Sequence, residues 1–288
     1  MARQRLAPLR RWPTVGLVTA SAESEPERRK RHFQRALFDG IAARYQEARP
    51  NYPSEILEFV AATAALRPGA AVLEVGCGTG QLTAALAGAG FRVTANDIGA
   101  SMIACARQRP GCGGVRFEIG AFEDLTADEA AFDLVVSSAA FHWIDPEVAF
   151  AKPARLLRAG GWLALLGTAD LYDEPVGPAL DELWIMHGDS GGAWQRRQSD
   201  SDAMAGTGLF GRPECITDSR RAVLSAAEVA RLESTRATFL GWPHGTQRRF
   251  MADLDRLLER SPAVGVIRQT SVTMAPALRA PGTSGRPC

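Results

Sequence analysis

The sequence lacks several features that would mark a membrane-spanning, metal-binding or disulfide-bonded protein. It has no run of about 18 apolar residues, so no segment is expected to span a bilayer as a helix. Its five cysteines form no CxxC pair and have no histidine at metal-ligand spacing, which argues against a disulfide framework and a zinc site. We therefore expect no metal cofactor, and a reducing cytoplasm as the simplest location.

Neither sign of charge predominates in the chain. The 33 basic residues balance 32 acidic residues, which leaves a formal net charge of +1. A protein without a global positive field has no general attraction for nucleic acid or for an anionic membrane surface. We therefore expect a small-molecule partner, with neither nucleic acid nor membrane as a partner, and the sequence leaves the oligomeric state open.

Residues 1–31 form an arginine-rich stretch without helical or strand periodicity. They hold eight basic and three acidic residues, which gives a local charge of +5 by subtraction. Such a composition predicts a mobile leader. The Arg10-Arg11 pair imitates the start of an export signal, but the apolar stretch that follows is short and contains Pro13, so the cytoplasm is favoured over export.

Residues 32–288 are expected to form a single domain in which strands and helices alternate. Short apolar, β-branched runs predict strands, and stretches with apolar residues every three or four positions predict helices, the first beginning with Ser54 as its N-cap. Alternation at this spacing predicts an α/β fold with a doubly wound, mostly parallel sheet covered on both faces. The predicted strands are 70–76, 91–97, 115–120, 132–138, 160–168 and 271–278.

The regularity fails over residues 168–211, which are rich in Gly, Asp and Ser but include Trp184, Met186 and Trp194. Long irregular insertions within compact domains are usually lids or binding elements. We therefore expect an irregular lid or substrate-binding insertion here. Two further helical stretches, at 225–241 and 247–260, follow it.

A glycine-rich loop, Gly76 to Gly80, lies between the first predicted strand and the next helix. Glycines at such a junction let a ligand approach the backbone and the N-terminal amides of the helix. Asp97 ends the second predicted strand, 21 residues after Gly76, where a carboxylate can accept hydrogen bonds from both ribose hydroxyls. This pairing predicts an adenosine-containing cofactor.

A second acid, Glu74, indicates which adenosine cofactor is expected. The loop reads GxGxG rather than GxGxxG, and Glu74 lies two residues before its first glycine, where it would repel a pyrophosphate. A cofactor with an ammonium group and a sulfonium, but without phosphate, would be attracted there instead. These properties describe S-adenosylmethionine.

Five segments resemble, in order and spacing, the successive motifs of class I S-adenosylmethionine-dependent methyltransferases. They are "VLEVGCGTGQLT", "VTANDIGASMIACAR", "FEIGAFEDL", "FDLVVSSAAFHWID" and "ARLLRAGGWLAL". The upstream "FDGIAARYQEARPNYP" resembles a small-molecule, methyltransferase type 11-like branch that includes trans-aconitate and ubiquinone-biosynthesis methyltransferases. The resemblance implies a Rossmann-like, seven-stranded, mostly parallel sheet with an antiparallel C-terminal edge hairpin.

The resemblance also implies roles for individual cofactor-binding residues. Asp97 would hold the ribose, and the glycine loop would line the methionine part through Gly76, Gly78, Thr79 and Gly80. Ile98 and Met102 would contact the adenine faces, although both are equally compatible with ordinary core positions.

One position departs from the family pattern. Ala121 stands where the family commonly has an Asp that bonds the adenine amino group, so recognition of adenine would pass to the backbone at Phe122 or to Glu123.

Cys77, within the glycine loop, is interpreted as a packing residue and not as a nucleophile, because no nearby base is evident.

The fourth predicted strand ends at Ser137 and Ser138, where ligands gather in open α/β sheets, which makes Ser137 a further cofactor-binding candidate. His142 is the candidate general base, and Trp143 could form an apolar or cation-binding wall; both are also compatible with simple packing at the pocket mouth. The upstream segment supplies three candidates for closing the site or holding substrate: Tyr45, Arg49 and Tyr52.

The predicted activity is direct, in-line transfer of a methyl group from S-adenosylmethionine to an oxygen, nitrogen or carbon nucleophile of a small molecule. Two alternatives stay open. A noncatalytic scaffold or regulatory protein that binds S-adenosylmethionine is suggested by Ala121 and by the insertion. An NAD-dependent dehydrogenase is disfavoured by the GxGxG spacing and by Glu74.

Overall fold

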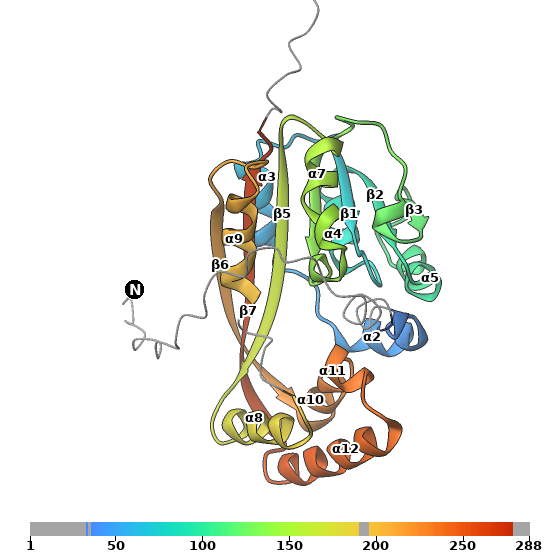
Figure 1. Cartoon of the computed structure of the whole chain (residues 1–288). Helices are drawn as coiled ribbons and strands as arrows, with labels where there is room; N and C mark the ends of the chain where they lie inside the picture. The colour runs from blue at the N-terminus through green and yellow to red at the C-terminus, as the bar shows by residue number, and fades with distance from the viewer. Residues whose placement is uncertain (1–32, 34–35, 190–195, 279–288) are drawn as a thin grey trace, which may run out of the picture.

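The computed structural model describes residues 33, 36–189 and 196–278, with the backbone alone for 196–200 (Figure 1). The predicted leader, residues 1–31, lies outside the described residues. Within the described residues, no helix is both long and apolar enough to cross a membrane.

A seven-stranded sheet runs through the part of the chain that the structure describes, in the order β3-β2-β1-β4-β5-β7-β6. Strands β1 to β5 pair in parallel, whereas β7 pairs antiparallel with both β5 and β6. The predicted mostly parallel sheet with an antiparallel C-terminal edge is thereby confirmed. The strands are β1 (Ala71–Val75), β2 (Arg92–Asp97), β3 (Arg116–Ile119), β4 (Phe132–Ser138), β5 (Leu157–Tyr172), β6 (Glu214–Ser225) and β7 (Ala263–Pro276).

Helices cover both faces of this sheet (Figure 1). The α-helices are α2 (Ala42–Ala48), α3 (Ser54–Thr63), α4 (Gln81–Gly88), α5 (Ala100–Gln108), α6 (Pro146–Ala149), α7 (Ala151–Leu156), α8 (Val176–Met186), α9 (Arg196–Gly206), α10 (Ala226–Glu233), α11 (Ala237–Leu240) and α12 (His244–Leu258). Three short 3₁₀ helices are η1 (Asp39–Ile41), η2 (Phe122–Asp124) and η3 (Phe141–Trp143).

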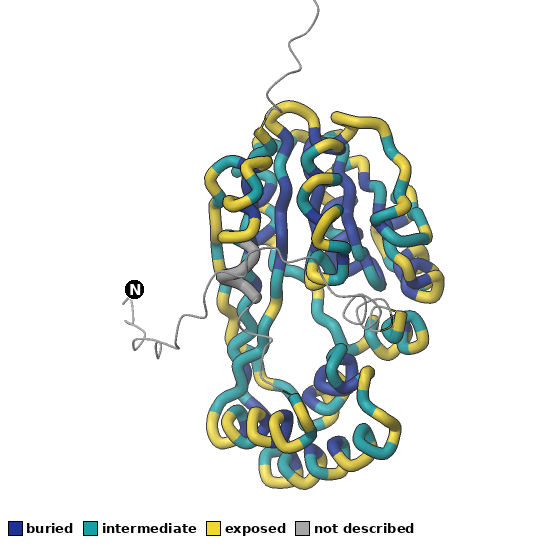
Figure 2. Tube along the Cα trace, in the orientation of Figure 1, coloured by how far each residue is buried: buried dark blue, intermediate teal, exposed yellow. Residues whose placement is uncertain are grey.

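The alternation of side chains along β1 explains why this central strand is mostly apolar. Val72 packs in a core cluster with Ile56 of α3 and Leu82 of α4, whereas its neighbour Leu73 packs in a second cluster with Leu156 of α7. A strand buried on both faces needs apolar residues at successive positions, which is the signal that the sequence carried. Figure 2 shows the resulting buried centre of the sheet.

A third apolar cluster lies at the far end of the long strands β5, β6 and β7, where α8, α10, α11 and α12 form a helical layer (Figure 1). In α12 the fully buried residues follow one another at four-residue intervals, Phe250, Leu254 and Leu258. Phe250 packs against Trp184 of α8, with ring centroids 4.5 Å apart. These contacts join α8 to α12 within the layer, and Val264 of β7 belongs to the same apolar cluster.

The stretch 168–211 differs from the expectation of an irregular insertion. Strand β5 continues to Tyr172, and α8 and α9 follow within the stretch. The apolar residues Val176, Leu180 and Leu183 recur at helical spacing and are buried, so α8 is a regular element of the helical layer. The expected role as a lid or substrate-binding element stays a prediction.

Two local expectations also need correction. Helix α3 begins at Ser54, so its N-cap is Pro53 and not Ser54. The Ser54 hydroxyl donates to Glu55 and caps no backbone amide. The sequence of residues 146–158 predicts one helix, which the structure divides at Phe150 into α6 and α7.

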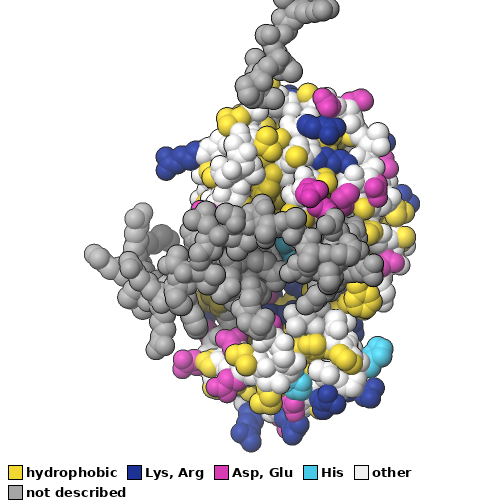
Figure 3. Space-filling model, viewed as in Figure 1, with side chains coloured by type: hydrophobic (Ala, Val, Ile, Leu, Met, Phe, Trp, Pro, Cys, Tyr) yellow, Lys and Arg dark blue, Asp and Glu magenta, His cyan; other side chains and the backbone are white. Residues whose placement is uncertain are grey.

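The described surface carries acidic and basic side chains interspersed, as the visible face in Figure 3 shows. This distribution agrees with a net charge of +1, since no large patch of one sign appears among the described atoms on that face.

Candidate functional site

The glycine loop follows β1 and begins at the carboxyl end of the parallel strands. Gly76 has a φ of +72°, and a Cβ added to it would lie 2.3 Å from the Cβ of Ala140. Gly80, with a φ of +82°, precedes α4, and an added Cβ would lie 3.0 Å from that of Ala106. Both positions therefore need glycine for the backbone conformation and for close packing.

Asp97 fastens the same loop from the end of β2. One carboxylate oxygen accepts a hydrogen bond from the Gly78 amide at 2.7 Å, and the other accepts one from the Gly99 amide at 2.8 Å. A carboxylate offers about four acceptor positions and can accept hydrogen bonds from ligand hydroxyls. The structure thus brings Asp97 and the glycine loop together, as predicted.

Glu74, in the middle of β1, is almost fully buried with 1% of its surface exposed. Burial raises the pKa of its carboxyl to about 8; the hydrogen bond from the Thr83 hydroxyl, at 2.6 Å, lowers that pKa, and the negative charge of Asp97 raises it. An acid that is protonated at neutral pH can become charged when a cation arrives beside it. Glu74 therefore suits a ligand that carries an ammonium group.

A first pocket opens above the loop, at the ends of β1, β2 and β4, and its empty space of about 690 Å³ includes open solvent. It is within the size range of small-molecule sites. Six of the predicted cofactor-binding residues line it: Gly76, Gly78, Asp97, Ile98, Met102 and Phe122. Ala121 also lines it, so the departure from the family pattern falls inside the pocket.

Four aromatic side chains line this first pocket: Phe38, Tyr45, Phe122 and Trp143. The ring of Phe38 meets Tyr45 edge-on at a centroid distance of 5.8 Å and lies 6.2 Å from Trp143. Phe38 therefore contacts both of the predicted residues Tyr45 and Trp143. The sequence analysis did not single out Phe38, although it lies in the motif at 38–53.

A second pocket adjoins the first, since Tyr45, Gly76, Gly78, Ser138 and Ala139 line both. Together they form one groove with a polar end. The predicted residues Arg49, Tyr52 and Glu74 line that end.

The floor of the second pocket comes from the antiparallel strands β5 and β7. Thr168 pairs in register with Thr270, and Asp170 pairs with Arg268, whose Nε lies 2.6 Å from the Asp170 carboxylate. The sequence analysis missed these four residues, because only the register of two distant strands brings them together.

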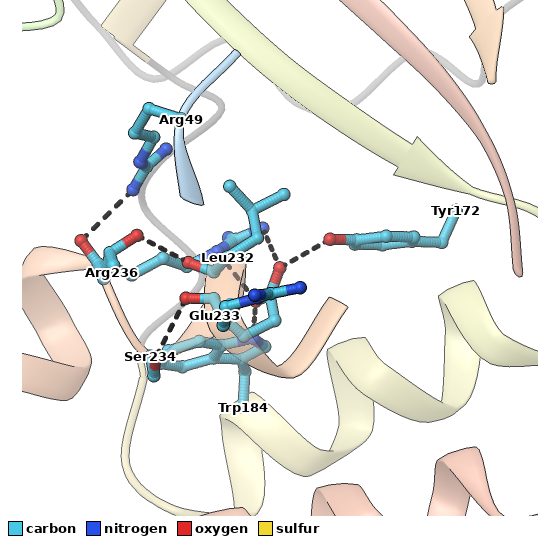
Figure 4. A network of polar contacts seen from close by, with 9 residues as sticks. Arg49, Tyr172, Trp184, Leu232, Glu233, Ser234 and Arg236 are labelled. Atoms are coloured by element: carbon cyan, nitrogen blue, oxygen red, sulfur yellow. Dashed lines mark hydrogen bonds and ion pairs between the residues drawn. The ribbon is translucent and has the colours of Figure 1, made fainter. Parts of the chain in front are cut away.

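The upstream segment reaches the groove through Tyr52 and Arg49. The Tyr52 hydroxyl is hydrogen-bonded to the Ser138 hydroxyl, and burial raises the pKa of Tyr52 above its ordinary value. The Arg49 guanidinium lies over the Tyr45 ring, 5.1 Å from its centroid, and donates to the carbonyl of Thr235 at 3.1 Å (Figure 4). Arg49 therefore links the groove to the helical layer.

A buried carboxylate, Glu233, organises the helical layer behind this link (Figure 4). It accepts hydrogen bonds from the Tyr172 hydroxyl at 2.8 Å and the Trp184 indole at 2.9 Å, and it pairs with both Nε and Nη2 of Arg236. Burial raises the pKa of Tyr172, and the charge of Glu233 adds to this effect. The network positions the strand end and helices that border the polar half of the groove.

Four predicted site residues lie outside the lining of both pockets. Thr79 is buried and donates to Gln81, Gly80 precedes α4, and the Ser137 hydroxyl donates to the carbonyl of Val75. His142 is exposed, with its ring 4.5 Å from that of Trp143. Their roles toward a ligand stay predictions, and the structure does not bring His142 into the groove.

Cys77 is buried, and burial raises the pKa of its thiol well above the ordinary value, which agrees with its interpretation as a packing residue. Within the described ranges, no group of three or more His, Cys, Asp and Glu side chains could hold a metal ion.

Comparisons with known proteins identify the domain around this groove. Residues 73–165 match the model of a family described as a methyltransferase domain. An uncharacterized methyltransferase of Mycobacterium tuberculosis is 35% identical over 130 residues, which cover 45% of this chain and 51% of that protein. A ubiquinone biosynthesis O-methyltransferase of Xanthomonas campestris is 39% identical over 113 residues, which cover 38% of this chain and 47% of that protein. The chain spans about half the length of these curated relatives.

A solved structure shows the same fold. It belongs to a protein of Anaeromyxobacter dehalogenans provisionally named a type II methyltransferase, with a TM-score of 0.59, 20% sequence identity, and coverage of 79% of this chain and 97% of that one. The family match supports the predicted resemblance to methyltransferases over residues 73–165, and the solved structure supports the predicted fold.

Proposed function

We propose that this chain, whose residues 73–165 match a methyltransferase domain, transfers methyl groups from S-adenosylmethionine to a small-molecule oxygen, nitrogen or carbon nucleophile. The observation that carries the proposal is the convergence of the glycine loop, Asp97 and Glu74 on one groove, at the carboxyl ends of the parallel strands. In open α/β sheets ligands bind at that edge.

The residues along the first pocket fit the nucleoside part of the cofactor. Asp97 presents at the end of β2 a carboxylate that the Gly78 and Gly99 amides orient, and a carboxylate can accept hydrogen bonds from ribose hydroxyls. Met102 and Phe122 are buried apolar side chains in the lining, and Ile98 is partly exposed there, so the three offer apolar contacts to a flat base. The fit supports an adenosine group in this half.

The residues at the junction of the two pockets fit the charged end of the cofactor. Gly76 and Gly78 carry no side chain that would fill the space, and Glu74 lies beneath them with a carboxyl that can ionise beside a cation. When bound, S-adenosylmethionine supplies a methyl group on a positively charged sulfur that is already activated for transfer. The protein's remaining tasks are to align the acceptor and to exclude water.

We infer that the methyl acceptor binds in the second pocket, over Thr168, Asp170, Arg268 and Thr270. The polar floor supports an acceptor with hydrogen-bonding groups. The Xanthomonas relative, a ubiquinone biosynthesis O-methyltransferase, supports a small-molecule acceptor for this chain. A general-base role for His142 and a cytoplasmic location stay predictions, and the proposed activity does not depend on either.

Titration calorimetry tests the proposal. Purified protein is titrated with S-adenosylmethionine, S-adenosylhomocysteine and NAD in parallel, and we expect roughly micromolar affinity for the first two and none for NAD. Glu74 is the reason, because its buried carboxyl can ionise beside an ammonium group, whereas a pyrophosphate offers it no cation. Binding of NAD alone would support the dehydrogenase alternative and overturn the proposal.

A second step separates an enzyme from a noncatalytic binder, the alternative that Ala121 suggests. The protein is incubated with S-adenosylmethionine and a panel of small alcohols, amines, phenols and carboxylic acids, and formation of S-adenosylhomocysteine is measured. Acceptor-dependent formation supports the methyltransferase. Tight cofactor binding without turnover across the panel would favour the scaffold.

A further inference from the structure

Strand β6 presents an open edge to its surroundings. It is the last strand in the sheet order, and within the part of the chain that the structure describes it pairs with β7 alone. Figure 1 shows it as the outermost strand drawn on that side of the sheet. The outward N–H and C=O groups of such a strand are able to pair with a further strand.

β6 lacks the features with which natural edge strands avoid this pairing. Natural edges are often short, or carry proline, lysine or a bulge that bends them away. β6 is twelve residues long, whereas strands usually have about 5–6. It contains neither proline nor lysine, and it pairs with β7 in one unbroken register from Glu214 to Ser225. These properties leave a long, regular edge that suits strand addition.

The charges that β6 does carry make its edge complementary to itself. Asp218 and Arg220 are two residues apart, so their side chains lie on the same face of the sheet. When two identical edges meet about a two-fold axis, the strands run antiparallel, and residues at equal distances from the axis lie opposite each other. An axis through Ser219 therefore places Asp218 of each copy opposite Arg220 of the other.

Three neighbouring registers oppose like charges instead. An axis through Asp218 would place that carboxylate opposite its own copy, and axes through Arg220 or Arg221 would do the same with a guanidinium. Like charges directly opposite each other destabilise a strand pair. These three registers are therefore disfavoured.

The length of the overlap separates the remaining register that opposes unlike charges. An axis through Thr217 would place Glu214 opposite Arg220, but it would pair only residues 214–220, which are seven. The axis through Ser219 pairs residues 214–224, which are eleven. The longer overlap forms more backbone hydrogen bonds for the same number of ion pairs, so it is favoured.

The register centred on Ser219 also covers exposed apolar surface. Val223 is 69% exposed, and in this register it lies opposite Cys215 of the second copy, which is also exposed. On the other face, Ile216 lies opposite Ala222. Cross-strand pairs of this kind contribute to the stability of an antiparallel pair.

We propose that two copies of this chain associate through β6, antiparallel about a two-fold axis through Ser219, so that the seven strands of each copy join in one continuous sheet. The backbone ladder supplies the affinity, and the charged and apolar pairs set the register. This inference is independent of the proposed function.

Exchange of the two charges tests the interface by sedimentation velocity. The unmodified protein should form a dimer with a roughly micromolar dissociation constant. Asp218→Arg and Arg220→Asp each place like charges opposite one another twice, so each variant alone should dimerise at least about tenfold more weakly. An equimolar mixture of the two variants opposes unlike charges again and should recover the dimer. Arg116→Asp, on the opposite edge strand β3, is the matched control and should dimerise like the unmodified protein.

A disulfide test reports the register directly. In a Cys215→Ser background, Ser219→Cys places the two introduced thiols opposite each other on chains whose Cα atoms are about 4.5–5.5 Å apart, within the span of a disulfide. Mild oxidation should therefore give a covalent dimer on non-reducing gels. Thr217→Cys in the same background is the control, because its two thiols would lie about 14 Å apart along the strands.

Three results would overturn the proposal. One is an unmodified protein that sediments as a monomer up to about 100 μM, which is also the result expected if another segment of the same chain covers β6. The second is a dimer that the charge variants leave unchanged, and the third is a disulfide that forms as readily with Thr217→Cys as with Ser219→Cys. Arg220 also contacts Glu55 of α3, so thermal unfolding first shows that Arg220→Asp is folded. If it is not, the disulfide test decides.

Discussion

The carboxylate of Asp97 and the backbone amide of Gly78 are joined by a hydrogen bond of 2.7 Å. In the proposed site this contact would give one side chain two roles, because the residue that we propose to hold a ribose also fixes the glycine loop. Asp97 itself is fixed by the Gly99 amide at 2.8 Å, so the carboxylate is oriented before any ligand arrives. Preorganised groups of this kind lose little entropy on binding.

Replacing Asp97 by Asn should weaken S-adenosylhomocysteine binding at least about tenfold, because hydrogen bonds to a charged acceptor contribute about 1.5–3 kcal/mol. Calorimetry measures this affinity, and Asp128→Asn, at an exposed position, is the control for loss of one charge. An unchanged affinity in the Asp97 variant would show that the ribose binds elsewhere.

Substitution of Gly76 by Ala should abolish cofactor binding, because the added Cβ would lie 2.3 Å from the Cβ of Ala140. Gly69→Ala is the matched control: it has a φ of +86° but no heavy atom within 4 Å of the added Cβ. The control should lose about 1–2 kcal/mol of stability and keep its affinity. Thermal unfolding and calorimetry on both proteins measure the difference, and equal behaviour of the two would contradict the steric argument.

Glu74 should make the ligand-free protein less stable as the pH rises. Its carboxyl has a pKa of about 8 in the folded protein and about 4.5 in the unfolded chain, so between these values the folded state holds a proton that the unfolded state has lost. Stability therefore falls with increasing pH through this window, by at most about 1.4 kcal/mol per pH unit.

Glu74→Gln should remove this component. Urea unfolding at pH 5.5 and pH 8 measures it, and the free energy of unfolding should fall less across this range in the variant than in the unmodified protein. The same pH dependence in both proteins would show that Glu74 titrates normally.

The parallel half of the fold could be predicted because β1 and β4 are buried on both faces and are therefore rich in consecutive apolar residues. Strand β6 escaped prediction for the opposite physical reason. It pairs only with β7, at the edge of the sheet, and its middle carries Asp218, Arg220 and Arg221, which follow no apolar period. Helix α8 did carry a period, Val176, Leu180 and Leu183, but its position among Gly, Pro and Asp residues favoured an irregular interpretation.

The site divides in the same way. Asp97 and the glycine loop were predictable, since their places at the ends of adjacent strands follow from a local strand-loop-helix pattern. Asp170 and Arg268 were not, because they are 98 residues apart and meet only through the register of β5 and β7. A single sequence specifies that register through burial and through packing of the whole sheet, and not through any local motif.

His142→Ala should keep most of the methyl-transfer activity, with kcat/KM lowered less than about fivefold, because the imidazole is exposed and lines neither pocket. Its contact is with Trp143, at a ring distance of 4.5 Å. The measurement is the pH profile of kcat for both proteins with the acceptor found in the turnover screen. Loss of the acidic limb, where protonation of a base lowers the rate, together with a fall of about 100-fold or more would instead establish His142 as the general base.

Removal of the buried carboxylate of Glu233 should destabilise the protein strongly. Glu233→Ala leaves the guanidinium of Arg236 without its ion-pair partner and deprives Tyr172 and Trp184 of an acceptor. Breaking a buried ion pair from one side costs about 3–5 kcal/mol.

Glu129→Ala is the matched control, because Glu129 pairs with Arg155 at the surface, where such a pair contributes at most about 1 kcal/mol. Urea unfolding of both variants measures the contrast. A loss in Glu233→Ala no larger than in the control would mean that the network contributes no net stability, and that packing around Phe250 alone holds the helical layer to the sheet.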